Sequence, residues 1–119
     1  MLTLKHTIFS KDSSDLEQVR NTLFELASNV NADFNGDNGD EYLEEVAKEK
    51  GYDNNLDYYF DYYAKFYDVN PIFNQSNCGD YHSLIQRIME EMLRGCYRGD
   101  WEFIINENEL IISVWVEWN

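Results

Sequence analysis

Basic residues are scarce in this chain. Nine lysines and arginines stand against 23 aspartates and glutamates, so the formal net charge is −14. Nucleic acid and anionic membrane surfaces attract positive charge, and both are therefore poor partners for this chain. Its excess negative charge favours solubility and fast encounter with cations or basic proteins, at a cost in self-repulsion.

Further absences narrow the class of protein. Two cysteines, Cys78 and Cys96, make no disulfide framework, which indicates a cytoplasmic chain with free thiols. The chain has no run of about 18 apolar residues, and its N-terminus lacks the basic start and apolar core of a signal peptide. Neither a spanning helix nor a secretory leader is therefore expected. The sequence also lacks a glycine-rich phosphate loop, a nucleophile elbow and a metal-binding helix motif, so we expect no enzymatic activity and no cofactor.

Aromatic residues, in contrast, are plentiful. They make up 16% of the chain, and 44% of all residues are hydrophobic. An acidic chain with few aromatics would be expected to stay disordered, but this composition can build a core. The length suits a single domain over residues 1–119.

Alternating residues predict strands at both ends of the chain. Leu2, Leu4, His6 and Ile8 alternate with polar residues, as in a half-buried strand. If Glu107 and Asn108 form a two-residue turn, Ile105 faces Leu110, Phe103 faces Ile112 and Trp101 faces Val114. These six side chains then share one side of a C-terminal hairpin. Ile104, Ile111 and Trp115 lie on the other side, which we expect to be partly covered.

Apolar stripes at helical spacing predict four helices between these strands. The first follows the capping residues Asp12, Ser13 and Ser14, and its stripe runs through Leu16, Val19, Leu23, Leu26, Ala27 and Val30. The second covers residues 40–50 and ends at Gly51, after a loop over residues 31–39. The third covers 55–67. Its tyrosines favour strand by propensity, but its apolar residues collect on one helical face, so it is assigned to helix, and Pro71 is expected to end it. The fourth runs from a capping Asp80 to Gly95. The predicted fold is α+β, with a small, mostly antiparallel sheet formed by the N-terminal strand and the C-terminal hairpin, packed with about four helices.

An acidic residue occupies every fourth position from 33 to 61. The members of this acidic ladder are Asp33, Asp37, Glu41, Glu45, Glu49, Asp53, Asp57 and Asp61. Positions four apart share a helix face, where like charges destabilise the helix by a few tenths of a kcal/mol per pair. Glycines interrupt the segment, so the ladder divides into rows on neighbouring elements. A solvated face is the plain interpretation, but the uncompensated cost favours a surface that binds something positive.

The predicted partner-binding surface combines carboxylates with tyrosine rings on which guanidinium groups can stack. Its residues are Asp37, Glu41, Glu45, Glu49, Asp53, Asp57, Asp61, Tyr58 and Tyr62. The rows of carboxylates could meet the lysines and arginines that otherwise bind the phosphates of a DNA strand.

Residues 33–44 also resemble an EF-hand calcium loop. Asp33, Asn35, Asp37 and Glu44 occupy its first, third, fifth and twelfth positions. Asn38 replaces the glycine of the sharp turn and Asp40 replaces the apolar eighth residue, so calcium binding is the lesser interpretation. Cys78 and His82 could form a nucleophile–base pair or two zinc ligands, but a packed thiol and a helix-start histidine explain them more simply.

Three features of the chain together resemble a known family of proteins. They are its size, the two carboxylate rows of residues 41–61 and the tyrosine-rich segment 57–63. The sequence resembles the DNA-mimic proteins of bacteria and phages, and most closely the small monomeric mimics that bind the histone-like protein HU. The resemblance implies a cytoplasmic monomer that occupies the nucleic-acid site of a basic DNA-binding protein and performs no chemistry. An immunity-type inhibitor of a toxic nuclease would use the same acidic surface, and a calcium-binding module is the second alternative.

Overall fold

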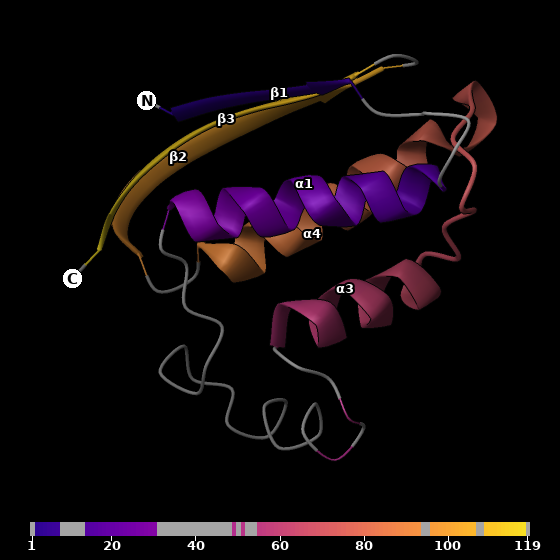
Figure 1. Cartoon of the computed structure of the whole chain (residues 1–119), viewed down its shortest axis with the longest axis horizontal. Coiled ribbons are helices and arrows are strands. Elements are labelled where there is room, and N and C mark those ends of the chain that lie inside the picture. The colour runs from indigo at the N-terminus through magenta and orange to yellow at the C-terminus, as the bar shows by residue number, and fades with distance from the viewer. Residues whose placement is uncertain are drawn as a thin grey trace.

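The computed structural model of the chain describes residues 2–7, 14–30, 49, 51, 55–93, 96–106 and 109–118. In these ranges the elements follow the order β1, α1, α3, η2, α4, β2, β3. Figure 1 shows the strands as one curved layer, with helices α1 and α4 along one side of it and α3 farther from the sheet. The predicted α+β class, with an antiparallel C-terminal hairpin, is confirmed.

The sheet contains β1 (Leu2–Thr7), β2 (Cys96–Ile105) and β3 (Glu109–Trp118) in the order β1-β3-β2. Both pairings are antiparallel, and β3 is the central strand. The hairpin has the predicted register, with Ile105 opposite Leu110, Phe103 opposite Ile112 and Trp101 opposite Val114. β1 pairs with the other edge of β3, where Leu4 lies opposite Ile112.

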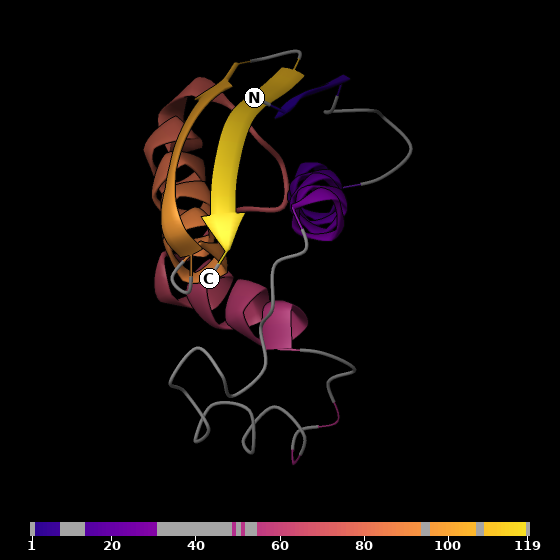
Figure 2. The ribbon, with the colours of Figure 1, turned by 90° about the vertical axis from the view of Figure 1, so that its left-hand side faces the viewer.

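One face of the hairpin lies in the core. Leu110, Ile112 and Val114 are fully buried, whereas Ile104 on the opposite face is 60% exposed. This alternation is typical of an antiparallel sheet with one face packed against helices. The expectation that the second face would be partly covered holds for Ile111, which is half-buried, whereas Ile104 and Trp115 are exposed and no described helix packs on this face (Figure 2).

Helix α1 (Asp15–Asn29) begins at one of the predicted capping residues. The Ser14 hydroxyl accepts a hydrogen bond from the Glu17 amide at 3.0 Å, which satisfies one of the donors at the helix start. The predicted stripe is buried along its length, except that Leu16 is half-buried.

Helix α3 (Asn55–Phe66) confirms the assignment from periodicity over the strand propensity of its tyrosines. It ends at Phe66, one residue before the predicted end, but Pro71 is too far along the chain to be the residue that ends it. Asp68 adopts a left-handed conformation with φ of 52°, and the Val69 amide donates back to the Ala64 carbonyl at 2.9 Å. This turn terminates the helix, as left-handed residues commonly do. Phe66 was expected on the apolar face. It lies in the last turn of the helix and is 67% exposed, and its ring packs edge-on against that of Tyr67.

Helix α4 (Cys78–Met92) begins earlier than predicted. The 3-10 turn η2 (Gln75–Asn77), capped by the Asn74 side chain, leads directly into it. Asp80 is therefore not the capping residue; it lies in the first turn, where its charge still favours the helix dipole. The helix ends at Met92, ahead of the predicted Gly95, which lies outside the described residues. The predicted loop at 31–39 and the predicted helix over 40–50 also lie outside them, apart from Glu49. Gly51, the predicted C-cap, has a φ of +82°.

A buried polar network ties the connection between α3 and α4 to the start of α1. The Asp15 carboxylate accepts a hydrogen bond from the Phe73 amide at 2.7 Å, and the Leu16 amide donates to the Pro71 carbonyl. The fully buried Tyr81 donates its hydroxyl proton to the Asn70 carbonyl at 2.6 Å. Burial, together with the nearby Asp15 carboxylate, raises the pKa of the Tyr81 hydroxyl above its usual range. The hydroxyl therefore stays a donor throughout the physiological pH range.

Of the described glycines, Gly99 has the least room for a side chain, because the neighbouring hairpin strand lies close to it. A Cβ there would lie 2.6 Å from the Trp115 carbonyl oxygen, which belongs to the backbone and cannot move aside. We expect Gly99→Ala to lower the free energy of unfolding by about 1–3 kcal/mol. Gly79→Ala is the matched control, because a Cβ in that first turn of α4 meets nothing within 4 Å. Urea denaturation followed by far-UV circular dichroism measures both, and equal stabilities of the two variants would contradict the close approach at Gly99.

Candidate partner-binding surface

Three members of the acidic ladder lie in the described part of the chain. Glu49 is exposed, while Asp57 and Asp61 of α3 are half-buried. The remaining predicted carboxylates, at Asp37, Glu41, Glu45 and Asp53, lie outside the described residues. So do Asp33, Asn35 and Glu44 of the calcium-loop interpretation.

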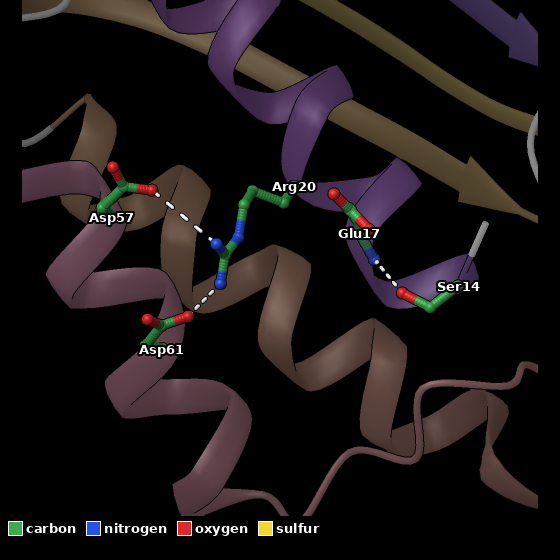
Figure 3. A network of polar contacts seen from close by, with 5 residues as sticks. All are labelled: Ser14, Glu17, Arg20, Asp57 and Asp61. Carbon is green, nitrogen blue, oxygen red and sulfur yellow. Dashed lines mark hydrogen bonds and ion pairs between the residues drawn. The ribbon is translucent and has the colours of Figure 1, made fainter.

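Asp57 and Asp61 share an arginine that comes from another helix. They lie one turn apart on α3, and Arg20 of α1 extends its guanidinium toward both of them (Figure 3). Its Nη1 atom lies 3.9 Å from an oxygen of Asp57, and its Nη2 donates a hydrogen bond to an oxygen of Asp61. A single positive charge therefore relieves the repulsion between two carboxylates at helical spacing.

The same guanidinium also contacts an aromatic ring. Its central carbon lies 5.0 Å from the centre of the Phe60 ring, within the range of a cation–π contact. Phe60 is fully buried, and Arg20 is 33% exposed at its side chain. Among the described residues, the buried Nε of Arg20 has no hydrogen-bond partner, so the two terminal nitrogens make its polar contacts. Arg20 thus joins α1 to α3 at the edge of the core.

This contact changes the interpretation of Asp57 and Asp61. The sequence analysis assigns both to partner binding, whereas the structure gives them an intramolecular partner 37 to 41 residues away in the chain. The sequence does carry a signal for it, because Arg20 borders the apolar stripe of α1 between Leu16 and Leu23. A cation beside a buried stripe is placed to reach carboxylates on a packed neighbour.

The two predicted tyrosines differ in exposure. Tyr62 is 49% exposed and can present its ring to a partner. Tyr58 is only 7% exposed, with its ring centre 6.3 Å from that of Tyr59. The prediction of both as contact residues overlooked that Tyr58 is packed, so a role in direct contact is left to Tyr62.

Every arginine with a described side chain contacts both a carboxylate and an aromatic ring. Arg87 pairs with Glu90 and Glu91 and lies 5.1 Å from the ring centre of Tyr63. A side-chain hydrogen bond with Tyr63 is the main cause that raises the pKa of Arg87.

The third arginine is the most exposed. Both ends of the Arg98 guanidinium donate to Glu117 at 2.7 Å, and its centre lies 6.0 Å from the Trp115 ring. Carboxylates beside aromatic rings are therefore the recurrent environment of guanidinium groups in this chain.

Exposed carboxylates extend beyond the ladder. They occur on each described α-helix or directly after it, and on the hairpin: Glu17, Glu25, Asp68, Asp80, Glu90, Asp100, Glu102 and Glu117 are all exposed. Lys65, Arg87 and Arg98 are the exposed cations with described side chains. Exposed acids therefore outnumber exposed basic residues on the described elements.

Among the described residues, the cysteines and His82 form no metal site. Cys78 and Cys96 are free thiols, and the His82 ring lies 4.7 Å from that of Phe103. Within the described ranges no group of three histidines, cysteines or acids could hold a metal ion.

The Arg20 contact can be measured by a double-mutant cycle. We expect Arg20→Met and Asp61→Asn to interact, with a coupling of about 1–2 kcal/mol, because their charges are half-buried and hydrogen-bonded. The control cycle is Arg98→Met with Glu117→Gln, a bidentate pair whose side chains are 63% and 47% exposed and whose coupling should be about 0–1 kcal/mol. Urea denaturation of the single and double variants gives both couplings. A weaker coupling at Arg20 than at Arg98 would show that the half-buried pair does not join the helices.

Comparisons of the chain with protein-family models, with curated proteins and with solved structures find no match. In the described ranges, no helix is both long and apolar enough to cross a membrane.

Proposed function

We propose that the chain is an acidic DNA mimic: it occupies the nucleic-acid site of a basic DNA-binding protein and competes there with DNA. The observation that carries this proposal is a net charge of −14 on a chain that exposes carboxylates on or directly after each described α-helix and on the hairpin. Such a field attracts basic surfaces and speeds their encounter. The proposed protein is a monomer in the cytoplasm, needs no cofactor, catalyses no reaction and contacts neither nucleic acid nor membrane.

The environments of the chain's own arginines support the proposal. Arg20, Arg87 and Arg98 each rest against an aromatic ring while pairing with one or two carboxylates. A DNA-binding protein presents the same guanidinium groups to phosphates. A surface built from carboxylates and tyrosines offers these groups charge and stacking at once.

Exposure separates the described contact residues of the proposal. Glu49 and Tyr62 are exposed, whereas Asp57 and Asp61 already hold Arg20. Arg20 and Lys65 of α3 together balance these two carboxylates, so α3 adds no excess negative charge. Among the described residues, direct contact is therefore assigned to Glu49 and Tyr62; Asp37, Glu41, Glu45 and Asp53 are proposed as contact residues from the sequence pattern alone.

The favoured partner is the histone-like protein HU, on the resemblance of the sequence to the small monomeric HU-binding mimics. The same surface would also serve an inhibitor of a toxic nuclease. The mode of binding can be tested without knowing the partner, because any such partner would release DNA when the chain binds.

We expect the chain to displace a labelled DNA duplex from HU, with an apparent affinity that falls at least tenfold between 50 and 200 mM salt, since exposed charges are screened over about 8 Å at physiological ionic strength. Fluorescence anisotropy of the duplex measures the displacement. Bovine serum albumin, another acidic protein, serves as the control for unspecific charge effects. A ternary complex of chain, HU and DNA, or displacement that ignores salt, would contradict the mimic model.

The second expectation concerns the contact residues. Glu45→Lys combined with Glu49→Lys should weaken HU binding about tenfold, mainly by slowing association, while the urea midpoint stays unchanged. Glu17→Lys combined with Glu25→Lys is the control, because it changes the net charge equally at two exposed helical positions outside the ladder. Surface plasmon resonance gives the rates.

Asp57 and Asp61 are left intact in this experiment, because their reversal would also remove the contact with Arg20. Equal weakening by the two double reversals would mean that total charge, and not the ladder, governs binding.

A further inference from the structure

The outer face of the hairpin is the side of β2 and β3 that points away from the helices (Figures 1 and 2). Cross-strand partners on this face are Ile104 with Ile111, Asp100 with Trp115, and Arg98 with Glu117. Ile104 is 60% exposed and Trp115 is 37% exposed, and no described helix covers them. Solvent-facing positions of an antiparallel sheet are usually polar, so a large aliphatic and a tryptophan here need an explanation.

Charges border these apolar side chains. Asp100 and Glu102 are exposed on β2, and Asp100 lies directly across from Trp115. A second copy of the chain would bring the same negative charges, and the whole net charge of −14, against this face. Like charges brought together in an interface cost several kcal/mol in the worst case and suppress association. The charge pattern therefore favours a basic occupant over self-association.

The face already holds one guanidinium group. Arg98 lies over the Trp115 ring and donates two hydrogen bonds to Glu117, both at 2.7 Å. This arrangement combines stacking with a bidentate ion pair, which lysine could not reproduce. Asp100 and Glu102 provide further carboxylates beside the same ring and beside Ile104.

From this geometry we propose that the outer face of the hairpin is a second docking surface, which binds an arginine-bearing segment of a partner protein that also carries apolar side chains. The apolar side chains of the segment cover Ile104 and Trp115, and its arginines pair with Asp100 and Glu102. The Glu102–Ser113 pair lies between the Ile104–Ile111 pair and the Asp100–Trp115 pair, so apolar and acidic positions alternate along this face and match a segment in which both kinds of side chain alternate. This proposal is independent of the acidic ladder, because none of its residues belongs to it.

A defined peptide tests the surface. The probe is a twelve-residue peptide of alternating arginine and isoleucine, titrated into the ¹⁵N-labelled chain at 150 mM salt. We expect shifts at the backbone amides of Ile104 and Ile111 and at the indole N–H of Trp115, and a dissociation constant at least tenfold lower than for a peptide of alternating arginine and serine.

Two variants with matched controls locate the site. Ile104→Ser should weaken binding of the arginine–isoleucine peptide about tenfold, while Ile72→Ser, 58% exposed in the connection after α3, should not. Glu102→Lys should weaken it more than Glu25→Lys, which alters the net charge equally at an exposed position of α1. Because all four side chains are exposed, these variants keep the fold, and their urea midpoints verify this.

Several outcomes would overturn the proposal. Equal affinity of the two peptides would show that charge alone attracts them. Shifts confined to other residues, or an effect of the Glu45 and Glu49 reversals as large as that of Ile104→Ser, would place binding elsewhere. Sedimentation of the free chain as a dimer that Ile104→Ser dissociates would identify a second copy as the occupant.

Discussion

One apolar core, shared by the sheet and helices α1, α3 and α4, holds together a chain whose surface charges repel one another. Its centre is formed by Leu23 of α1, Phe60 of α3, Ile85 of α4 and Ile112 of β3, all fully buried. Burial of apolar surface stabilises the fold by about 25 cal/mol per Å². This is the large favourable contribution that opposes the self-repulsion of the 23 acidic residues. Most of this core is aliphatic, and Tyr59, Phe60 and Tyr81 are the aromatic residues among its buried members.

The arginines are used where repulsion would otherwise concentrate. Arg20 joins two carboxylates one turn apart on α3, and Arg87 does the same for the neighbouring Glu90 and Glu91 on α4. Arg98 donates two hydrogen bonds to Glu117 across the hairpin. These contacts stabilise individual elements locally while leaving the total charge strongly negative. The described arginines thus serve the fold, and the remaining field is available to attract a partner.

Regular, local patterns in the sequence predicted much of the fold. The hairpin register followed from a period of two and a two-residue turn, because a slip by one residue would expose Leu110, Ile112 and Val114. A period of 3.6 identified α3 in spite of its tyrosines, since packing of one face outweighs intrinsic propensity.

The ends of helices were harder to predict, because several local solutions compete. Asp68 in a left-handed conformation stopped α3 ahead of Pro71, and a 3-10 turn displaced Asp80 from the cap of α4. The link from Arg20 to Asp61 was missed for another reason: it spans 41 residues and depends on how two helices pack. The ladder itself is periodic and therefore visible in the sequence, but which of its members have intramolecular partners is a tertiary property.

The layered arrangement also bears on how the two proposed surfaces could act. Helices α1 and α4 lie between the sheet and α3 (Figure 1). A helix with its side chains is about 10 Å thick, which exceeds the screening length of about 8 Å at physiological ionic strength. Charges on the outer face of the hairpin therefore exert little influence on α3, whose Tyr62 is assigned to the first surface. A partner large enough to reach both faces would gain from two weak contacts joined in one molecule, whereas two small partners would bind without affecting one another.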